Sequence, residues 1–305
     1  MRAVVLRGSG GPELFTVEDV PRPEPGPGEV LLRVDAASIN PVDFKTRSGG
    51  GFRDVMGPPP WILGWDVAGT VVAAGPGASR FREGDAVFGL VRFPTLGRTY
   101  AEYTAVPENE LVLRPAAISA VVAAALPLVA LTAWQALSLA GLKSGERALI
   151  LGGAGGVGHV AIGIARAWGA KVAATASAAK AAFLTEQGAV PLDYGRANWA
   201  AGVQPFDVVL NTVGPAAWAE AHPAVKSGSR VVHIAGPAGK DPVAGVVELR
   251  HLVHPDAASL ERIAALVVDG IVKPRVERVY PMTEMGAAHA HLETGRVAGK
   301  LVLTW

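Results

Sequence analysis

The chain has 305 residues, a formal net charge of +1 at pH 7 and no cysteine. This length exceeds what one small hydrophobic core usually organises, so two domains are expected. The near-neutral charge provides no basic surface for nucleic acid, and the absence of cysteine excludes disulfides, thiolate zinc sites and cysteine nucleophiles.

Short β-like runs fill the first part of the chain, up to about residue 114. Clusters rich in proline and glycine, such as PRPEPGPGE and AAGPG, separate them. The runs cover residues 3–6, 29–36, 67–74, 86–88 and 101–106. This pattern predicts a compact, mostly antiparallel β domain.

The uncharged stretch 115–142 is the single candidate for a membrane span. Its apolar content is largely alanine, and Ser119, Pro127, Thr132 and Gln135 interrupt it. Two successive helices that meet near Pro127 fit this composition better than one span. The amino terminus, MRAVVLRG, lacks the long apolar segment of a signal peptide, so we expect a cytoplasmic protein without a membrane partner.

A strand, a glycine-rich turn, a helix and a second strand follow over residues 147–177. The apolar run 148–151 is typical of a strand that is buried on both faces. Gly153, Gly155 and Gly158 then satisfy G-x-G-x-x-G, in which missing side chains permit a tight turn, close approach of backbone to pyrophosphate and close packing of helix on strand. The residues expected to bind the pyrophosphate are Gly153, Ala154, Gly155, Gly156, Val157 and Gly158.

An apolar stripe at helical spacing, from Val157 to Trp168, predicts the helix, with His159 and Arg166 off the stripe. Gly169 ends it, and residues 171–175 form the second strand. Because the glycines occur in this order of elements, they predict a dinucleotide site.

Charge after the second strand indicates which dinucleotide binds. Proteins that prefer NAD usually place Asp or Glu there, roughly 20 residues after the first glycine, to bind the ribose 2'-hydroxyl. This chain has no acid in that region before Glu186. Because a carboxylate would repel a 2'-phosphate, its absence favours NADP(H), and Ser177 and Lys180 could supply a hydroxyl donor and a cation. Lys180 also fits an ordinary solvated lysine.

From about residue 121 strands and helices alternate, which predicts a parallel, doubly wound sheet. The expected elements are a helix at 178–187 and strands at 191–193, 207–210 and 230–234, then a helix at 259–268, a strand at 276–280, a helix from an N-cap at Thr283 to 292, and a last strand at 300–303. Only residues 237–245 separate the strand near Ile234 from the next apolar run, 246–253. A parallel crossover with its own helix needs a dozen or more residues, so we expect an unusual connection.

Several spaced motifs resemble the medium-chain dehydrogenases and reductases, in order and over nearly the whole chain. They are SINPVDFKTRSG at 38–49, GWDVAGTVVAAGPGASRFREGDAVFG at 64–89, GRTYAEYTAVPENELVLRP at 97–115, LPLVALTAWQAL at 126–137 and the closing GRVAGKLVL. Within that superfamily the chain looks most like the zinc-free quinone oxidoreductases. The resemblance implies an α/β fold: a GroES-like, mostly antiparallel β domain at 1–120, completed by 256–305, enclosing a Rossmann NADP-binding domain at 121–255, with the active site in the cleft between them.

The chain departs from the zinc-binding relatives where they have a ligating histidine and a glutamate. Trp65 and Asp66 stand there, and an indole nitrogen donates a hydrogen bond but has no available lone pair for a metal. The histidines at 222, 233, 251, 254, 289 and 291 are dispersed, so we expect ordinary surface or capping residues and no metal site. Without a metal, the remaining chemistry is hydride delivery from NADPH to an already conjugated acceptor, a quinone or an α,β-unsaturated carbonyl. Attack at the β-carbon makes an enolate, which needs hydrogen-bond donors and a proton.

The resemblance also implies roles for single residues. Asn40 would lie near the nicotinamide and the substrate, Thr132 near the nicotinamide or its phosphate, and Tyr194 at the adenosine 2'-phosphate. The loops 211–214, with Asn211 and Val213, and 235–236, Ala235 and Gly236, would line the cofactor crevice. Lys45 could orient a carbonyl oxygen or assist protonation, but a solvated surface lysine fits equally, and Asp43 fits a structural cap.

The sequence leaves open the acceptor and two alternative functions. Loops 50–60 and 91–97 are expected to build the substrate pocket, and they do not distinguish a quinone from an enone. Two other readings are an NADPH-binding protein without turnover, as among crystallin-like relatives, and a reductase of carrier-bound enoyl thioesters. The run 246–253 would form a sheet edge on which a second copy can pair, and the resemblance implies the same, so we expect a homodimer.

Overall fold

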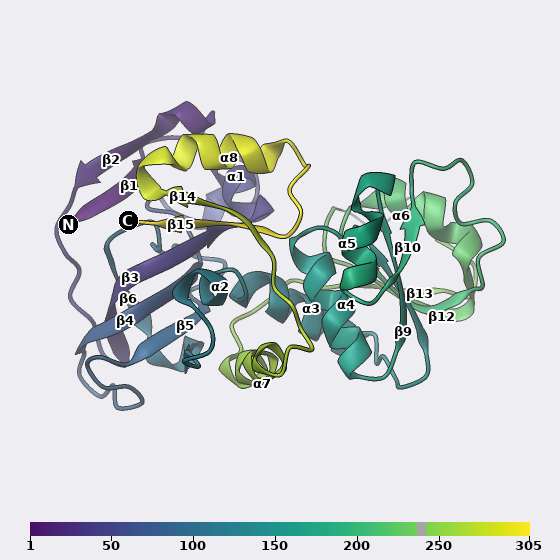
Figure 1. The fold of residues 1–305 in the computed structure, drawn as a ribbon. Helices are drawn as coiled ribbons and strands as arrows, with labels where there is room; N and C mark the ends of the chain where they lie inside the picture. Colours follow the sequence, from purple (N-terminus) through teal and green to yellow (C-terminus); the bar gives the residue numbers. More distant parts are fainter. Residues whose placement is uncertain (237–241) are drawn as a thin grey trace. The chain divides into compact units, whose positions relative to one another are not determined.

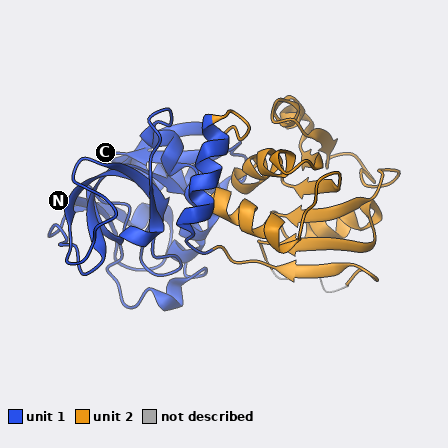
Figure 2. Cartoon of the chain, turned by 90° about the horizontal axis from the view of Figure 1, so that it is seen from below, with its two compact units in different colours: residues 1–128, 254–268, 274–305 blue, residues 129–253, 269–273 orange. Residues whose placement is uncertain are grey.

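The computed structural model describes residues 1–236 and 242–305 (Figure 1). These residues form two compact units (Figure 2). Unit 1 comprises residues 1–128, 254–268 and 274–305, and unit 2 comprises residues 129–253 and 269–273. Both ends of the chain therefore build unit 1. The helix α2 (Ala120–Ala124) belongs to unit 1, and the first division falls inside α3 (Pro127–Leu139), eight residues after the boundary expected at 120.

Unit 1 contains a seven-stranded sheet in the order β14-β15-β3-β4-β5-β7, with β6 paired to β3. Its strands are β3 (Glu29–Ile39), β4 (Asp66–Ala74), β5 (Ala86–Leu90), β6 (Tyr103–Pro107), β7 (Leu111–Leu113), β14 (Val276–Pro281) and β15 (Lys300–Thr304). All neighbours pair antiparallel except β14 and β15. A separate antiparallel pair joins β1 (Arg2–Leu6) and β2 (Phe15–Asp19). The mostly antiparallel β domain is confirmed.

The core of unit 1 follows from strand periodicity. Val30, Leu32 and Val34 of β3 point to one face of the sheet because side chains alternate along a strand. They pack with Val67 and Val71 of β4, and all five are 5% exposed or less. This packing fixes the ends of β3 and β4, where the polar residues described below lie.

Unit 2 contains a six-stranded, entirely parallel sheet in the order β10-β9-β8-β11-β12-β13. Its strands are β8 (Arg147–Leu151), β9 (Lys171–Ala176), β10 (Val190–Asp193), β11 (Phe206–Asn211), β12 (Val225–His233) and β13 (Val247–Arg250). Its helices include α4 (Gly156–Ala167), α5 (Ala181–Glu186) and α6 (Pro215–Ala221) (Figure 1). The chain moves outward in one direction after β8 and in the other after β11, so the topological switch point lies between these two strands. The Rossmann sheet expected from the sequence is confirmed.

The short connection after β12 leads to a parallel strand. β13 pairs with β12 from Arg230↔Val247 to His233↔Arg250. Part of the connection, residues 237–241, lies outside the described residues, and the flanking residues 234–236 and 242–246 form no helix. β12 is also longer than predicted, since it begins at Val225.

Several local predictions were wrong. Thr283 does not cap a helix: it lies inside a 3-10 turn, Met282–Glu284, and Glu284 precedes α8 (Met285–Glu293). Met282 is fully buried, and this anchoring turns the chain before the helix begins. His159, placed off the apolar stripe by its spacing, is nevertheless buried, because α4 is buried all round from Gly158 to Ala165 and His159 is 1% exposed.

Two short helices escaped prediction. α1 (Pro41–Arg47) and α6 both begin with proline at the first helical position, where its fixed φ suits the helix and its missing N–H costs nothing. The remaining helix, α7 (Ala257–Val268), agrees with the predicted span 259–268.

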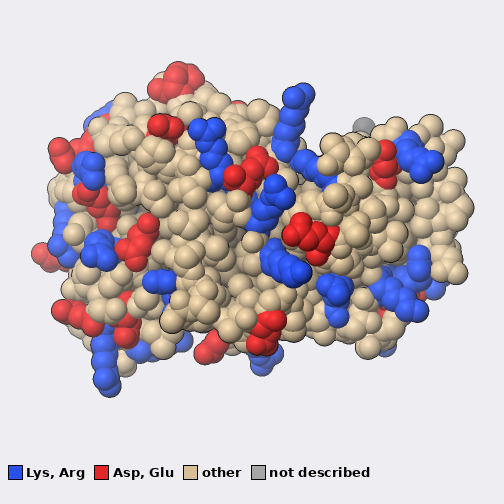
Figure 3. Space-filling model, viewed as in Figure 1, with Lys and Arg blue, Asp and Glu red and all other residues tan. Residues whose placement is uncertain are grey.

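No helix in the described part of the chain is long and apolar enough to cross a membrane. The stretch 115–142 forms α2 and α3, as predicted, while the cytoplasmic location stays a prediction. On the face shown in Figure 3, acidic and basic side chains are interspersed, in agreement with the small net charge.

Candidate functional site

The glycine-rich turn connects β8 to α4 at the switch point of the unit 2 sheet. Gly152 follows β8 with φ of +80°, a backbone conformation that favours glycine. Thr175 of β9 holds the turn, because its Oγ1 accepts from Gly152 N at 3.0 Å and its carbonyl oxygen accepts from Gly153 N at 2.8 Å. The turn is therefore fixed by the neighbouring strand before any ligand binds.

The three glycines of the G-x-G-x-x-G motif, Gly153, Gly155 and Gly158, do not all lack a side chain for the same reason. A Cβ on Gly153 would lie 2.5 Å from Ala174 Cβ, and a Cβ on Gly158 would lie 2.2 Å from Gly152 O, so packing excludes side chains there. A Cβ on Gly155 would meet only Gly152 O, at an ordinary 3.4 Å, and its φ is −78°. Neither packing nor backbone conformation requires glycine at 155, which leaves open space beside the start of α4.

Backbone donors surround that space. The first amide of α4 with a backbone acceptor is His159 N, which donates to Gly155 O at 3.1 Å. Within the described chain, the amides of Ala154, Gly156, Val157 and Gly158 have no backbone acceptor. Free N–H groups and the positive end of a helix dipole together bind anions such as phosphate. The turn thus has the donors and the room for a pyrophosphate.

Residues predicted for the 2'-phosphate end lie at the carboxyl ends of β9 and β10. Ser177 precedes a 3-10 turn directly after β9, and Lys180 is the last residue of that turn. Tyr194 N donates to Ala176 O at 3.2 Å, which places Tyr194 next to the same strand end, with its side chain 55% exposed. Asp193, which the sequence analysis did not consider, lies beside them, but its Oδ1 accepts from Gly195 N at 2.9 Å in its own turn.

The residues predicted to line the cofactor crevice lie in the loops after β11 and β12 and on α3. Asn211 is fully buried, and its Oδ1 accepts from Val213 N at 3.1 Å and from Gly214 N at 3.0 Å, so its side chain shapes the turn 211–214. Val213 is 58% exposed. Ala235 and Gly236 follow β12, and Arg250 donates to Gly236 O at 2.7 Å. Thr132 lies on α3 and is 5% exposed.

A buried polar cluster lies at the ends of β3, β4 and β15 in unit 1. Asp66 Oδ2 accepts from Asn40 Nδ2 at 2.7 Å and from Ser38 Oγ at 2.6 Å. Lys300 Nζ donates to Asn40 Oδ1 at 2.5 Å and to Ile39 O at 2.7 Å, and lies 3.8 Å from Asp66 Oδ2. Asn40 is fully buried, and its amide is held from both ends.

Burial shifts the protonation of this cluster. It raises the pKa of Asp43, whose Oδ2 accepts from Asn40 N at 2.7 Å, to about 7. It also lowers the pKa of Lys300, although the carboxylates of Asp66 and Asp43 act in the opposite direction. Because its side chain accepts from the Asn40 amide at the start of α1, Asp43 caps this helix, as the sequence suggested. Lys45 on the same helix is exposed to solvent.

Trp65 takes a packing role at the position where zinc-binding relatives have histidine. Its indole Nε1 donates to Thr95 O at 2.5 Å, and its ring meets Phe93 edge-on at 5.4 Å. Phe93 in turn meets Phe52 at 5.2 Å. No group of three His, Asp or Glu side chains with metal-binding geometry occurs among the residues that the structure describes.

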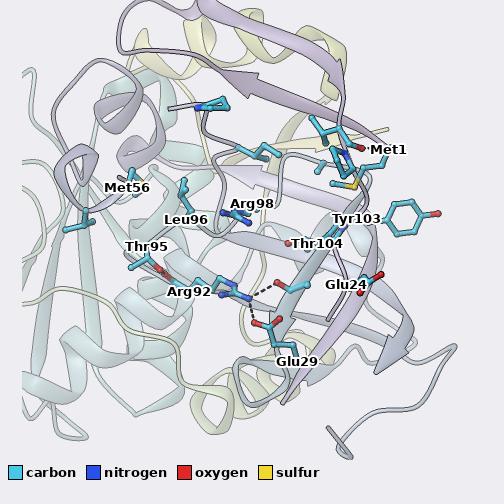
Figure 4. Close-up of a pocket in the computed structure, with 18 residues that line it drawn as sticks. Met1, Glu24, Glu29, Met56, Arg92, Thr95, Leu96, Arg98, Tyr103 and Thr104 are labelled. Atoms are coloured by element: carbon cyan, nitrogen blue, oxygen red, sulfur yellow. Dashed lines mark hydrogen bonds and ion pairs between the residues drawn. The ribbon is translucent and has the colours of Figure 1, made fainter. Parts of the chain in front are cut away.

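Figure 4 shows a pocket of about 520 Å³ in unit 1. Val55, Met56 and Pro60 line it together with Thr95 and Leu96, so both loops expected to shape a substrate pocket contribute. Arg92 and Glu29, which also line the pocket, form an ion pair, and Arg92 donates to Ala105 O at 3.0 Å.

Two buried histidines contradict the expectation of surface or capping residues. His289 packs between the rings of Phe15 and Tyr100, and burial lowers its pKa to about 3. His233 is 2% exposed at the end of β12. Sequence reasoning also missed Lys300 and Glu248, because a charged residue inside a strand shows no partner in local sequence; the partners of Lys300 lie about 260 residues away.

Comparisons with known proteins agree with this architecture. Residues 26–116 match the family model of the alcohol dehydrogenase GroES-like domain, and residues 187–303 match that of the zinc-binding dehydrogenases. The chain is 38% identical over 288 residues to a 2-methylene-furan-3-one reductase of Solanum lycopersicum, covering 90% of this chain and 71% of the relative. It is 35% identical over 317 residues to an NADPH-dependent alkenal/one oxidoreductase of Arabidopsis thaliana, covering 99% and 79%.

A solved structure shows the same fold. The quinone oxidoreductase from Coxiella burnetii superimposes with a TM-score of 0.93 at 32% identity, covering 100% of this chain and 99% of that one.

Proposed function

Since the chain belongs to the quinone oxidoreductase family of the medium-chain dehydrogenases and reductases, we propose that it transfers a hydride from NADPH to a quinone or an α,β-unsaturated carbonyl without zinc. The observation that carries the cofactor assignment is the open space at Gly155. A Cβ at this position would clash with no other atom of the protein, and the space adjoins backbone N–H groups that have no backbone acceptor. The names of the relatives, which include an NADPH-dependent alkenal/one oxidoreductase, support the same cofactor and acceptors.

The residues of unit 2 fit NADPH part by part. The amides of Ala154, Gly156, Val157 and Gly158 would hold the pyrophosphate, and Ser177, Lys180 and Tyr194 would hold the adenosine 2'-phosphate. The turn 211–214 and the residues Ala235 and Gly236 would border the nicotinamide half, with Thr132 as a further contact. NADPH, when bound, supplies the hydride.

A conjugated acceptor needs no metal to polarise its carbonyl group, because the conjugation itself makes the β-carbon electrophilic. Hydride addition at the β-carbon places negative charge on the carbonyl oxygen, which needs donors and then a proton at the α-carbon. We assign a positioning contact with nicotinamide and acceptor to Asn40, whose amide is held rigid by Asp66 and Lys300. Lys45 is the proposed proton donor, since it is exposed on α1, the helix that directly follows Asn40.

Zinc independence is supported by how Trp65 and Asp66 are used. The indole N–H of Trp65 already donates to Thr95 O. Both oxygens of Asp66 accept hydrogen bonds, Oδ2 from Ser38 and Asn40 and Oδ1 from Leu128 N at 2.7 Å. A cation at this position would have to displace all of these donors.

An NADPH oxidation screen tests the proposal. Quinones, linear enones and enals are offered in turn, with NADH in parallel and with a metal chelator present throughout. We expect NADPH oxidation with at least one conjugated acceptor. Binding of NADPH without oxidation by any of them would instead identify a non-catalytic NADPH-binding protein, and activity confined to carrier-bound enoyl thioesters would identify an enoyl reductase.

We also propose a homodimer that forms through β13. This strand is the edge of the unit 2 sheet, and Val247 on it is 51% exposed. An edge strand leaves backbone N–H and C=O groups that can pair with a strand of another chain. Gel filtration at micromolar concentration should give a dimer, and a monomer alone would contradict the proposal.

A further inference from the structure

A chain of hydrogen-bonded side chains crosses three neighbouring strands of unit 2. Glu248 lies on β13, His233 ends β12 and Asn211 ends β11. His233 is in register with Asn211 on one side and with Arg250 on the other. Because the strands are parallel, these residues lie toward the carboxyl edge of the sheet, where the loops proposed to border the nicotinamide begin.

The orientation of the Asn211 amide is fixed by four hydrogen bonds. Oδ1 accepts from the amides of Val213 and Gly214, while Nδ2 donates to Gly214 O at 2.9 Å and to His233 Nδ1 at 3.1 Å. An amide oxygen only accepts and an amide nitrogen only donates, so the flipped side chain would lose its three bonds to the backbone of the turn. The turn also contains Gly214 with φ of +142°, a conformation that side chains rarely adopt.

The Asn211 contact decides the protonation of His233. Since Nδ1 must accept from Asn211, Nε2 carries the hydrogen and donates to Glu248 Oε2 at 3.1 Å. A protonated ring would direct an Nδ1–H at the Asn211 amide hydrogens. The charged groups facing the ring are Glu248, which raises its pKa, and Arg250, which lowers it; His222 lies behind Trp218, whose ring is 5.7 Å from His233. Burial is the largest influence and lowers the pKa, in agreement with a neutral ring.

Glu248 joins this chain to the helix after the turn. Its Oε1 accepts from Trp218 Nε1 at 3.2 Å, and Trp218 is a fully buried residue of α6, which begins directly after Gly214. One carboxylate on an edge strand therefore supports the turn from both sides, through His233 and Asn211 and through Trp218.

We propose that Glu248 and His233 are positioning residues for the nucleotide, and that the chain Glu248–His233–Asn211 holds the turn 211–214 in the shape that NADPH requires. The proposal rests on the proposed function, because that function makes the turn a cofactor loop. Neither residue is a catalytic residue, since each acts on the turn through other side chains.

Glu248→Gln tests the chain by removing one acceptor. Trp218 Nε1 and His233 Nε2 both need an acceptor at position 248, and glutamine has one oxygen. With that oxygen on Trp218, the glutamine nitrogen faces His233 Nε2, so the ring proton moves to Nδ1 and opposes Asn211 Nδ2. Loss of a buried hydrogen bond of this kind should raise the Kd for NADPH about five- to tenfold, with KM for NADPH increased and kcat nearly unchanged.

Glu220→Gln is the matched control. Glu220 also accepts from an indole, Trp199 Nε1 at 3.3 Å, and it lies in the same unit on α6, but it has no bond to the turn. Its Kd for NADPH should equal that of the unaltered protein. Equal Kd values for Glu248→Gln and Glu220→Gln, with NADPH bound by the unaltered protein, would overturn the proposal while leaving the proposed function intact.

A second measurement needs no variant. Nitrogen-15 NMR of the unaltered protein without nucleotide should show His233 as the neutral Nε2–H tautomer, and the Nδ1–H tautomer would overturn the proposal even if Glu248→Gln failed to fold. An unaltered protein that binds no NADPH would contradict the proposed function itself and with it the role of the chain.

Discussion

Alanine at Gly158 should lower the stability of the fold, whereas alanine at Gly155 should weaken NADPH binding. In Gly158→Ala the new Cβ would lie 2.2 Å from Gly152 O and 2.8 Å from Gly153 Cα. Both are backbone atoms, so α4 must move away from β8, and overpacking of this kind costs about 1–3 kcal/mol. The higher helix propensity of alanine returns about 1 kcal/mol. The net loss in the free energy of unfolding is then up to about 2 kcal/mol.

In Gly155→Ala the free energy of unfolding should change little. The Cβ would lie 3.4 Å from its only near neighbour, and alanine readily adopts φ of −78°. Glycine is the better N-cap, but alanine restricts the unfolded chain, which stabilises by about 0.4–1 kcal/mol, so the two effects offset each other. The methyl group would instead fill the space beside the free amides. Loss of one hydrogen bond to a charged phosphate costs about 1.5–3 kcal/mol, or about 10- to 150-fold in the Kd for NADPH.

Urea denaturation gives the stability of both variants, and a fluorescence titration with NADPH gives the Kd. We expect Gly155→Ala to be as stable as the unaltered protein but to bind NADPH weakly, and Gly158→Ala to be destabilised. NADPH bound by Gly155→Ala with unaltered Kd would refute the assignment of the open space to the pyrophosphate. A destabilisation of Gly155→Ala equal to that of Gly158→Ala would refute the packing argument.

Three further predictions concern unit 1. Burial raises the pKa of Asp43 from 3.8 to about 7, so the folded state holds a proton that the unfolded chain has released, and this contribution to stability is lost as pH rises through that window. Asp43→Asn should therefore lose less stability than the unaltered protein between pH 5 and pH 8 in urea denaturation, and equal losses would contradict the shift. Trp65→His should lower the free energy of unfolding, by at most the about 3–5 kcal/mol that truncation of a buried Trp to Ala costs. It should gain no zinc-stimulated turnover, because the oxygens of Asp66 remain engaged; an activity that rises on zinc titration would show otherwise. Lys45→Ala should lower kcat with an enone and leave the Kd for NADPH unchanged, whereas an unaltered kcat would remove Lys45 as proton donor.

Features carried by local sequence were predictable. The order of strand, glycine turn and helix at 148–168 located the glycine-rich turn between β8 and α4, because each step leaves a local signature in periodicity or in glycine. The other strands of the two sheets were found for the same reason, but the three-residue strand β7 was not named. β12 also starts earlier than its apolar run, since Ser229 and Gly228 in its first half interrupt the pattern.

Features that depend on distant contacts were not predictable. Nothing near Lys300 reveals that it lies buried against Asn40 and Asp66, and nothing near His233 reveals that Glu248 and Asn211 hold its ring. These residues look like ordinary surface charges in sequence, because their partners come from neighbouring strands that only the fold brings together. The sequence identified Asn211 through its place at a strand end, but the role of its side chain within the turn required the structure.

Transfer of deuterium from NADPH deuterated at the hydride position to a linear enone, in the presence of a metal chelator, tests the central claim most directly. Hydride delivery to an acceptor activated by its own conjugation predicts a saturated ketone that carries deuterium on the former β-carbon. Deuterium on the carbonyl carbon of an alcohol product, or loss of transfer when the chelator is added, would contradict it.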